Sequence, residues 1–355
     1  MTGVTAAGSW PGGDQLTAQL EVFEDLTTAP FGVTAVPFWV TPNDSGPHGG
    51  LFGRTLSLLD QMPVEVGPHG WKLADRPGGD VRSLVRGLDQ NVETLSIAAA
   101  GYQGPLSLCV VGPWTLAASL YTARGDRVLA DRGAVRALAD SLGAGVDALI
   151  ARIRSALPGV TELSVQVDEH LIGQVAAGVL PTFSGYSRIP RVPGPELVEL
   201  SRGFYSLITQ SGARAVVRVG DAWVGIAPSV VAGATAVCLD FGAGSGWNGS
   251  SWNAQGWNEQ AWEHIARAAE KGVELWFGLP APEISSCAGP NLLALAQAIT
   301  VPWRRIGLES HRLAAVTISP SGNALRNSFG ATATARGTIA TLKKVAEHLA
   351  EKASE

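Results

Sequence analysis

The sequence predicts an α/β protein built as a single (β/α)8 (TIM) barrel over residues 1–355. Short apolar segments rich in Val, Ile and Leu alternate with helical segments along the whole length, and no linker or change of composition divides the chain. Of the residues 46% are hydrophobic and 16% charged, which is enough apolar material for one large core. The 43 glycines and 21 prolines indicate many tight turns between short elements. A parallel sheet of about eight strands, closed into a barrel, accounts for these observations.

Six apolar segments give the clearest strands, and helical segments separate them. In chain order these strands are expected at 105–112, 161–168, 213–220, 234–240, 273–279 and 313–319. Weaker candidates precede them at 4–9, 33–40 and 63–66. The strongest helices are expected at 132–157, where apolar residues recur three and four positions apart, and at 259–272, which closes with a glycine.

Composition and charge exclude several classes of partner. The net charge is −5, and basic residues occur as short pairs such as Arg304-Arg305, so we expect neither nucleic acid nor an anionic membrane as a partner. No apolar run approaches the roughly 20 residues that cross a bilayer, and the first residues lack the pattern of a signal peptide. Cys109, Cys238 and Cys287 lie far apart and form no metal-binding pair. Together these features predict a cytoplasmic protein.

In a TIM barrel the chemistry lies where the strands end, at the carboxyl-terminal rim. Side chains two positions apart on a strand share a face, so Gln166 and Asp168 point the same way. By the same count, Arg218 and Asp240 face inward at the ends of the next two strands. A buried guanidinium needs anionic partners, and Asp168 and Asp240 are the obvious ones. The sequence therefore predicts a polar pocket of mixed charge at this rim.

Four segments resemble the catalytic barrel of the cobalamin-independent methionine synthase family. They are GSWP (8–11), GPWT (112–115), VQVDE (165–169) and the segment 175–189 that follows. The family carries GSFP, GPVT and QIDEP in the same order and at similar spacing. Full-length members are two barrels long, so the chain is similar to their catalytic half. The resemblance implies a TIM barrel in which zinc holds homocysteine as a thiolate and a methyl group passes from a folate or corrinoid donor to the sulfur, a reaction of methionine biosynthesis.

The resemblance also implies roles for individual residues. Ser9 and Asp168 match the serine and aspartate that hold the amino-acid part of homocysteine. The zinc ligands are not retained, because the family's His, first Cys, Glu and last Cys fall, by strand order, on Arg218, Gly220, Asp240 and Ser321. Zinc takes three or four N, S or O ligands, and a guanidinium beside it would repel the dication. We therefore expect a degenerate site without zinc, in which the chemistry is altered or lost.

The predicted site combines these residues. Catalytic roles are expected for Asp168, Arg218 and Asp240, and substrate-binding roles for Ser9, Trp114, Gln166, Asp168 and Ser321, with no metal ligand. The ligand is expected to be small and either amino-acid-like or anionic. The resemblance points to a homocysteine S-methyltransferase of the methionine synthase type. An alternative stays open, in which the barrel is a regulatory protein that binds a ligand without catalysis and engages a protein partner through the segment Trp247–Trp262.

Other features leave further alternatives open. The stretch CLDFGAGSGW (238–247) is similar to the glycine-rich turn of S-adenosylmethionine methyltransferases, but too few strands follow it, so a glycine loop is favoured. Tryptophans recur every five residues in the Trp/Asn-rich loop 242–262, where they either pack on the rim or contact a ligand or partner. We expect His170 to be a hydrogen-bonded loop residue, and Glu169 to face away from the pocket or into the following loop.

Overall fold

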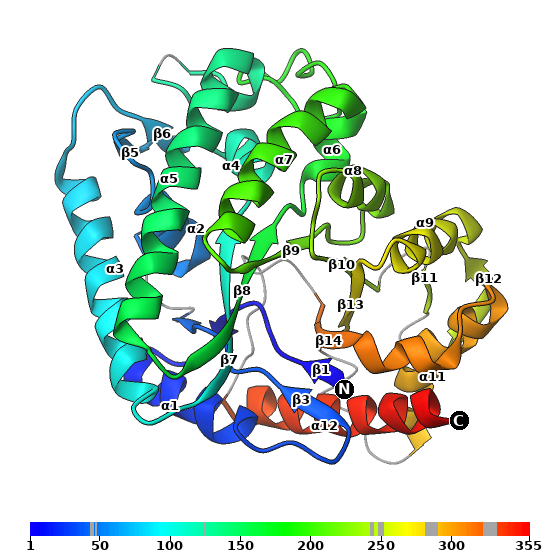
Figure 1. Ribbon diagram of the computed structural model, residues 1–355. Coiled ribbons are helices and arrows are strands. Elements are labelled where there is room, and N and C mark those ends of the chain that lie inside the picture. Colours follow the sequence, from blue (N-terminus) through cyan, green and yellow to red (C-terminus); the bar gives the residue numbers. More distant parts are fainter. Residues whose placement is uncertain are drawn as a thin grey trace.

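A computed structural model of the chain describes residues 1–355 except 43–45, 47, 124, 242–244, 248–251, 281–289 and 322–331. For 42, 245–247, 252–257, 290 and 291 it describes the course of the backbone alone. The chain forms a barrel of parallel strands inside a ring of helices (Figure 1). The fold class expected from the sequence is therefore confirmed.

The barrel strands lie side by side in chain order. They are β1 (Thr2–Val4), β3 (Val33–Ala35), β7 (Gly104–Val111), β8 (Val160–Asp168), β9 (Arg214–Arg218), β10 (Ala236–Asp240), β13 (Glu274–Leu279) and β14 (Thr317–Pro320). β14 returns to pair with β1. Just beyond β3, Phe38 bridges in parallel to Ser107 of β7, whose N–H donates to the carbonyl of Pro37 at 2.9 Å. This bridge closes the barrel.

Helices form the outer layer (Figure 1). The long ones and those that follow strands are α1 (Gln15–Leu26), α3 (Gly79–Ala98), α5 (Arg132–Ala156), α7 (Gly194–Gln210), α8 (Ile226–Val231), α9 (Glu259–Glu270), α11 (Pro290–Arg305) and α12 (Thr332–Ser354). Shorter segments are α2 (Gly50–Leu56), α4 (Pro113–Ser119), α6 (Ile172–Ala177) and the 3-10 turns η1 (Val128–Ala130), η2 (Trp223–Gly225) and η3 (Ser310–Ala315). Within the described ranges, no helix has the length and apolar character needed to cross a membrane.

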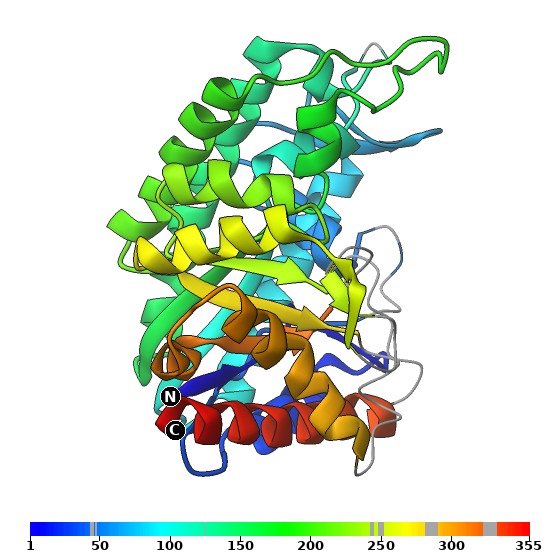
Figure 2. The ribbon, with the colours of Figure 1, turned by 90° about the vertical axis from the view of Figure 1, so that its right-hand side faces the viewer.

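Three pairs of short strands lie outside the barrel sheet. They are β2 (Ser9–Trp10) with β4 (Thr41–Pro42), β5 (Val64–Gly67) with β6 (Gly70–Leu73), and β11 (Ser245–Trp247) with β12 (Trp252–Trp257). The expectation of a barrel strand at 63–66 is wrong, because this segment belongs to the β5–β6 hairpin. Its alternating pattern suits a hairpin as well as a barrel strand. Figure 2 shows the β11–β12 hairpin beyond the carboxyl ends of the strands, opposite both termini.

Side chains along β8 point alternately towards the helices and into the barrel. Leu163, Val165 and Val167 are buried in the apolar core that the sheet shares with the helices. Gln166 and Asp168, which alternate with them, point into the barrel, where Gln166 contacts residues of other strands. The inward face of β8 is therefore polar towards its carboxyl end while its outer face is apolar, as the alternation in the sequence predicts.

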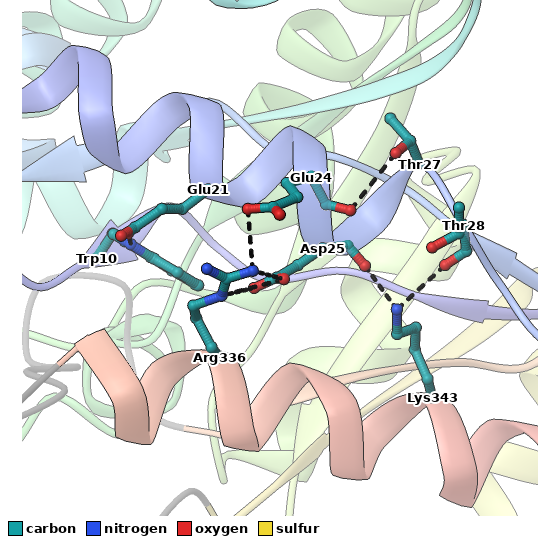
Figure 3. A network of polar contacts seen from close by, with 8 residues as sticks. All are labelled: Trp10, Glu21, Glu24, Asp25, Thr27, Thr28, Arg336 and Lys343. Carbon is teal, nitrogen blue, oxygen red and sulfur yellow. Dashed lines mark hydrogen bonds and ion pairs between the residues drawn. The ribbon is translucent and has the colours of Figure 1, made fainter.

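The first and last helices are joined by ion pairs (Figure 3). Arg336 of α12 donates from Nε and Nη2 to the carboxylate of Asp25 at 2.7–3.2 Å, and from Nη2 to Glu24 at 3.0 Å. Lys343 donates to the backbone carbonyls of Asp25 at 2.7 Å and Thr28 at 3.1 Å. These groups are partly exposed, so each pair stabilises the fold by at most ~1 kcal/mol. These contacts hold α12, the last helix, against the end of α1, the first helix.

Candidate functional site

Arg218 is the centre of a polar group inside the barrel. It ends β9, and its side chain is only 2% exposed. Nη1 donates to Oε1 of Gln166 at 3.2 Å and to Oγ of Ser319 at 3.3 Å. Nη2 pairs with Oδ1 of Asp240 at 3.3 Å. Burial acts to lower the pKa of Arg218, but neighbouring groups, led by Cys238 and Asp240, outweigh burial and raise it. The guanidinium therefore stays charged and lies across the barrel between three strands.

Asp168 ends β8 directly beside Arg218 in the sheet. Its carboxylate is 1% exposed, and Oδ2 lies 3.1 Å from Nδ1 of His170. Oδ1 is buried and has no hydrogen-bond partner among the described residues. Of the two carboxylates expected to partner Arg218, the structure thus pairs it with Asp240, while Asp168 turns to His170. A buried acceptor without a donor costs about 1–3 kcal/mol, so Oδ1 is an open position for a donor from a ligand.

Gln166 holds the guanidinium in place. Its Nε2 donates to the carbonyl of Ala6 and to Oγ of Ser107, both at 2.8 Å, which leaves Oε1 to accept from Arg218. The amide thereby links β8 to β7 and to the segment after β1. We interpret Gln166 as a positioning residue for Arg218, not as a direct ligand contact.

Glu169 caps helix α4 and does not face the polar group. Its Oε1 accepts from the N–H of Trp114 at 3.0 Å and Oε2 from the N–H of Thr115 at 2.7 Å. These two donors belong to the first turn of α4, where backbone N–H groups lack partners in the helix. Burial raises the pKa of Glu169 to about 7, against the lowering effect of the two hydrogen bonds. This carboxylate therefore ties the end of β8 to the helix after β7.

Gly112 is required by the same arrangement. A Cβ atom on Gly112 would lie 2.3 Å from Cδ of Glu169, far inside van der Waals contact. The motif GPWT thus supplies a glycine that admits the carboxylate, and two N–H groups that bind it. Trp114, expected in the pocket, lies elsewhere: it is fully buried and its indole donates to Oγ of Ser201 on α7 at 3.0 Å. The side chain of Trp114 therefore packs between α4 and α7 in the layer of helices.

The remaining predicted residues lie at two places on the rim. Ser321 follows β14 and lies close to Asp240, because a Cβ on Gly278 would be 1.9 Å from Oδ1 of Asp240 and 3.0 Å from Cα of Ser321. The absence of a side chain at Gly278 makes room for both. Ser9 is buried on β2, where it pairs with Thr41 of β4.

Arg54 is a second buried guanidinium, and the sequence analysis missed it. It projects from α2 and is 5% exposed. Nη1 donates to the carbonyl of Val40 at 3.0 Å, Nη2 donates to Oγ1 of Thr41, and the guanidinium carbon lies 4.1 Å from the ring centroid of Trp39. Nε has no partner among the described residues. Burial lowers the pKa of Arg54 to about 10, so it is charged at neutral pH although its contacts with the described residues are uncharged.

Arg54 lies near Ser9, since Thr41 contacts both of them. A buried cation is costly unless an anion or a set of hydrogen bonds compensates it. One signal in the sequence could have revealed Arg54, namely an arginine within the apolar stretch LFGRTLSLL (51–59).

The two described cysteines are unreactive core residues by their surroundings. Cys109 and Cys238 are free thiols, both fully buried. Burial raises the pKa of Cys238 to about 12 and raises that of Cys109 further. Both thiols are therefore protonated at neutral pH, and a protonated thiol is a poor nucleophile. Cys287 lies outside the described residues.

The described residues of the rim present no ligand set for zinc. In the part of the chain that the structure describes, no three His, Cys, Asp or Glu side chains come together in a way that could hold a metal. At the positions that match the family's ligands, Gly220 has no donor atom and Asp240 is engaged by a guanidinium at 3.3 Å. Gly220 has φ +62°, and a Cβ there would touch Cβ of His170 at 3.4 Å.

The Trp/Asn-rich loop contains a hairpin. Trp247 pairs with Trp252, and Ser245 pairs with Trp257, with a shift of register between the two pairs. Trp262 is buried on α9, with its ring centroid 6.0 Å from that of Phe277 of β13. The glycine-rich stretch 242–244 and the side chains of the other three tryptophans lie outside the described residues. Contact of this hairpin with a ligand or a partner stays a prediction.

Comparisons with known proteins extend the fold assignment. No protein-family model matches the chain, and no curated protein matches its sequence. Among solved structures, a B12-independent methionine synthase from Shewanella sp. W3-18-1, in complex with selenomethionine, has a TM-score of 0.55. The similarity covers 99% of this chain and 97% of that one, with 10% sequence identity. A D-psicose 3-epimerase in the presence of D-fructose gives a TM-score of 0.36 at 14% identity, over 74% and 81% of the two chains. Identities this low bear on the fold alone.

Proposed function

We propose that the carboxyl ends of the strands bind a small amino-acid-like ligand without zinc. The observation that carries this proposal is Oδ1 of Asp168, a buried carboxylate oxygen with no donor among the described residues. A ligand ammonium group at Oδ1 would supply both the missing hydrogen bond and a charge partner. His170 occupies the other oxygen and so leaves this one position for the ligand.

The second half of such a ligand would be its carboxylate. Arg54 is a buried cation whose contacts with the described residues are uncharged, and it lies near Ser9 through their common neighbour Thr41. A carboxylate received by Ser9 and Arg54 would compensate that charge. The ligand class is therefore an α-amino acid, bound as a zwitterion. The structural similarity to a methionine synthase that holds selenomethionine agrees with this class.

Methyl transfer to homocysteine would need a thiolate at the rim. A free thiol has a pKa near 8.5, and without a metal it is mostly protonated at neutral pH. Arg218 could stabilise an anion, but it is already paired with Asp240 at 3.3 Å. The proposed function is thus amino-acid binding by a methionine-synthase-like barrel, with the family's methyl transfer altered or lost.

Calorimetry with L-methionine and L-homocysteine tests this proposal. The chain is titrated after treatment with a chelator and again with added zinc. We expect the same affinity in both conditions, and Asp168→Asn should weaken binding at least about tenfold because a charged hydrogen bond is lost. Asp89→Asn, which changes an exposed carboxylate on α3, serves as the matched control and should bind like the native chain. Binding that requires zinc, or equal affinity of Asp168→Asn, would refute the proposal.

A regulatory role is the second candidate. The β11–β12 hairpin places several tryptophans beyond the strand ends (Figure 2), and aromatic residues are enriched in protein interfaces. Two results together would favour a regulatory role over an enzyme. The chain would bind an amino acid without turnover, and replacing 245–257 by a short Gly/Ser linker would abolish binding of a protein partner.

We also propose a cytoplasmic location for the protein. The free thiols of Cys109 and Cys238 support it, because thiols stay reduced in the cytoplasm.

A further inference from the structure

A large cavity opens at the amino end of the barrel, opposite the proposed amino-acid site. It has a volume of about 760 Å³. Its wall includes residues from the starts of several strands, namely Gly3, Thr34, Pro105, Glu162, Arg214 and Glu274. Small-molecule sites commonly measure about 300–1,000 Å³, whereas the inside of a TIM barrel is normally filled by side chains. The volume therefore suits a small ligand.

Small residues explain why the cavity reaches into the barrel. Gly3 and Thr317 are partners on β1 and β14, and a Cβ on Gly3 would lie 2.3 Å from Oγ1 of Thr317. Ser164 and Thr317, both largely buried, add two hydroxyl groups to the wall. Larger apolar side chains at these positions would fill the space. The barrel is thus hollowed at this end by glycine and hydroxyl residues.

An unsatisfied donor lies in this wall. Trp276 of β13 lines the cavity and is 3% exposed, and its indole Nε1–H is buried without a hydrogen-bond partner among the described residues. Buried indole N–H groups nearly always find a partner. An oxygen atom of a ligand in the cavity, reached by a small movement of the indole, would satisfy it.

The charges at the entrance balance one another. Arg214 pairs with Glu162 at 2.8 Å and also with Glu274. Arg312, at the same entrance of the amino-end cavity, pairs with Glu309 at 3.5 Å and donates to a backbone carbonyl. A cavity of this kind has no strong preference for a charged ligand. Carboxylates, hydroxyls, a guanidinium and an indole N–H together offer many donors and acceptors, which suits a neutral molecule with several hydroxyl groups.

We propose that this amino-end cavity is a binding site for a small neutral carbohydrate, of one or two sugar rings. The site is distinct from the rim around Asp168 and does not depend on the function proposed there. Calorimetry and ligand-observed NMR, with D-glucose and maltose as probes, test it. At least one probe should bind saturably, and D-glucuronate should bind no more tightly than D-glucose because the entrance carries charges of both signs.

Two variants locate the site without enlarging any side chain. Trp276→Phe removes the indole N–H, and Thr317→Val replaces a hydroxyl by a methyl of similar size. Each should weaken binding of the sugar by about 2- to 10-fold, the range for one hydrogen bond, while Asp168→Asn should leave it unchanged. Circular dichroism confirms that both variants are folded. No saturable binding of either neutral probe up to about 50 mM, or unchanged affinity in both variants, would overturn the proposal.

Discussion

Nη2 of Arg218 lies 3.3 Å from Oδ1 of Asp240 inside the barrel. The same guanidinium contacts Gln166 and Ser319, so these contacts join four strands of the barrel, β8, β9, β10 and β14. We propose that this pair takes the place of a bound dication, because the sequence resemblance assigns zinc ligands of the methionine synthase family to both positions.

Replacing Arg218 should destabilise the barrel. Arg218→Met leaves the buried carboxylate of Asp240 without its cation, and removal of one partner of a buried pair typically costs about 3–5 kcal/mol. Denaturant unfolding measures the change. In the double variant with Asp240→Asn the cost should be smaller than the sum of the two single changes, since the orphaned charge is gone. Additive costs would show that the pair is not coupled.

Gly112 should tolerate no side chain. Gly112→Ala would place a Cβ 2.3 Å from Cδ of Glu169 and force the carboxylate from the first turn of α4. We expect the free energy of unfolding to fall by about 1–3 kcal/mol, the usual cost of overpacking. Gly87→Ala is the matched control, because nothing lies within 4 Å of its Cβ in helix α3. There the exchange should raise stability by about 0.5–1 kcal/mol. An equal change in the free energy of unfolding at both positions would contradict the close contact between Gly112 and Glu169.

Glu169 should make stability depend on pH. Its pKa in the folded chain, about 7, lies above the ordinary value of 4.5. Folding therefore favours the protonated form, and the resulting stabilisation is full below pH 4.5 and lost as the pH rises through 7. Urea unfolding between pH 4.5 and 8 should show a loss of about 1–3 kcal/mol that Glu169→Gln removes. Glu162→Gln, at an exposed carboxylate on the same strand, should retain the native profile.

The described thiols should be inert in the folded chain. In Cys287→Ser, Cys109 and Cys238 are the remaining cysteines, both fully buried and with raised pKa. Reaction with a thiol reagent at pH 8 should be negligible in buffer and complete in denaturant, because only an accessible thiolate attacks the reagent. Rapid labelling of the native variant would mean that a thiolate is present at the rim.

The barrel was predictable because its evidence is spread along the chain. Each strand carries its own apolar segment, and alternation in TELSVQVD placed Gln166 and Asp168 inside correctly. The segment 63–66 failed because four alternating residues do not distinguish a hairpin from a barrel strand. The pairing of Arg218 with Asp240 followed from strand order, which fixes neighbours in a barrel.

The site was less predictable, because it depends on tertiary packing that no local pattern encodes. Arg54 comes from a helix between two barrel strands, and its inward direction depends on the way that helix packs. Trp114 lies within the GPWT motif but points to Ser201 on α7, since the motif serves to receive Glu169. The sequence also did not show that Trp247 and Trp252 pair in a hairpin, because a five-residue spacing matches neither helix nor strand periodicity.

Metal analysis of the purified chain tests the central claim most directly. The chain is produced in zinc-supplemented medium, treated with a chelator and measured by inductively coupled plasma mass spectrometry, with Arg218→His as a companion. The account predicts that the native chain retains no stoichiometric zinc, because a guanidinium stands among the positions that would bind it. One zinc ion per native chain, retained through the chelator, would contradict it.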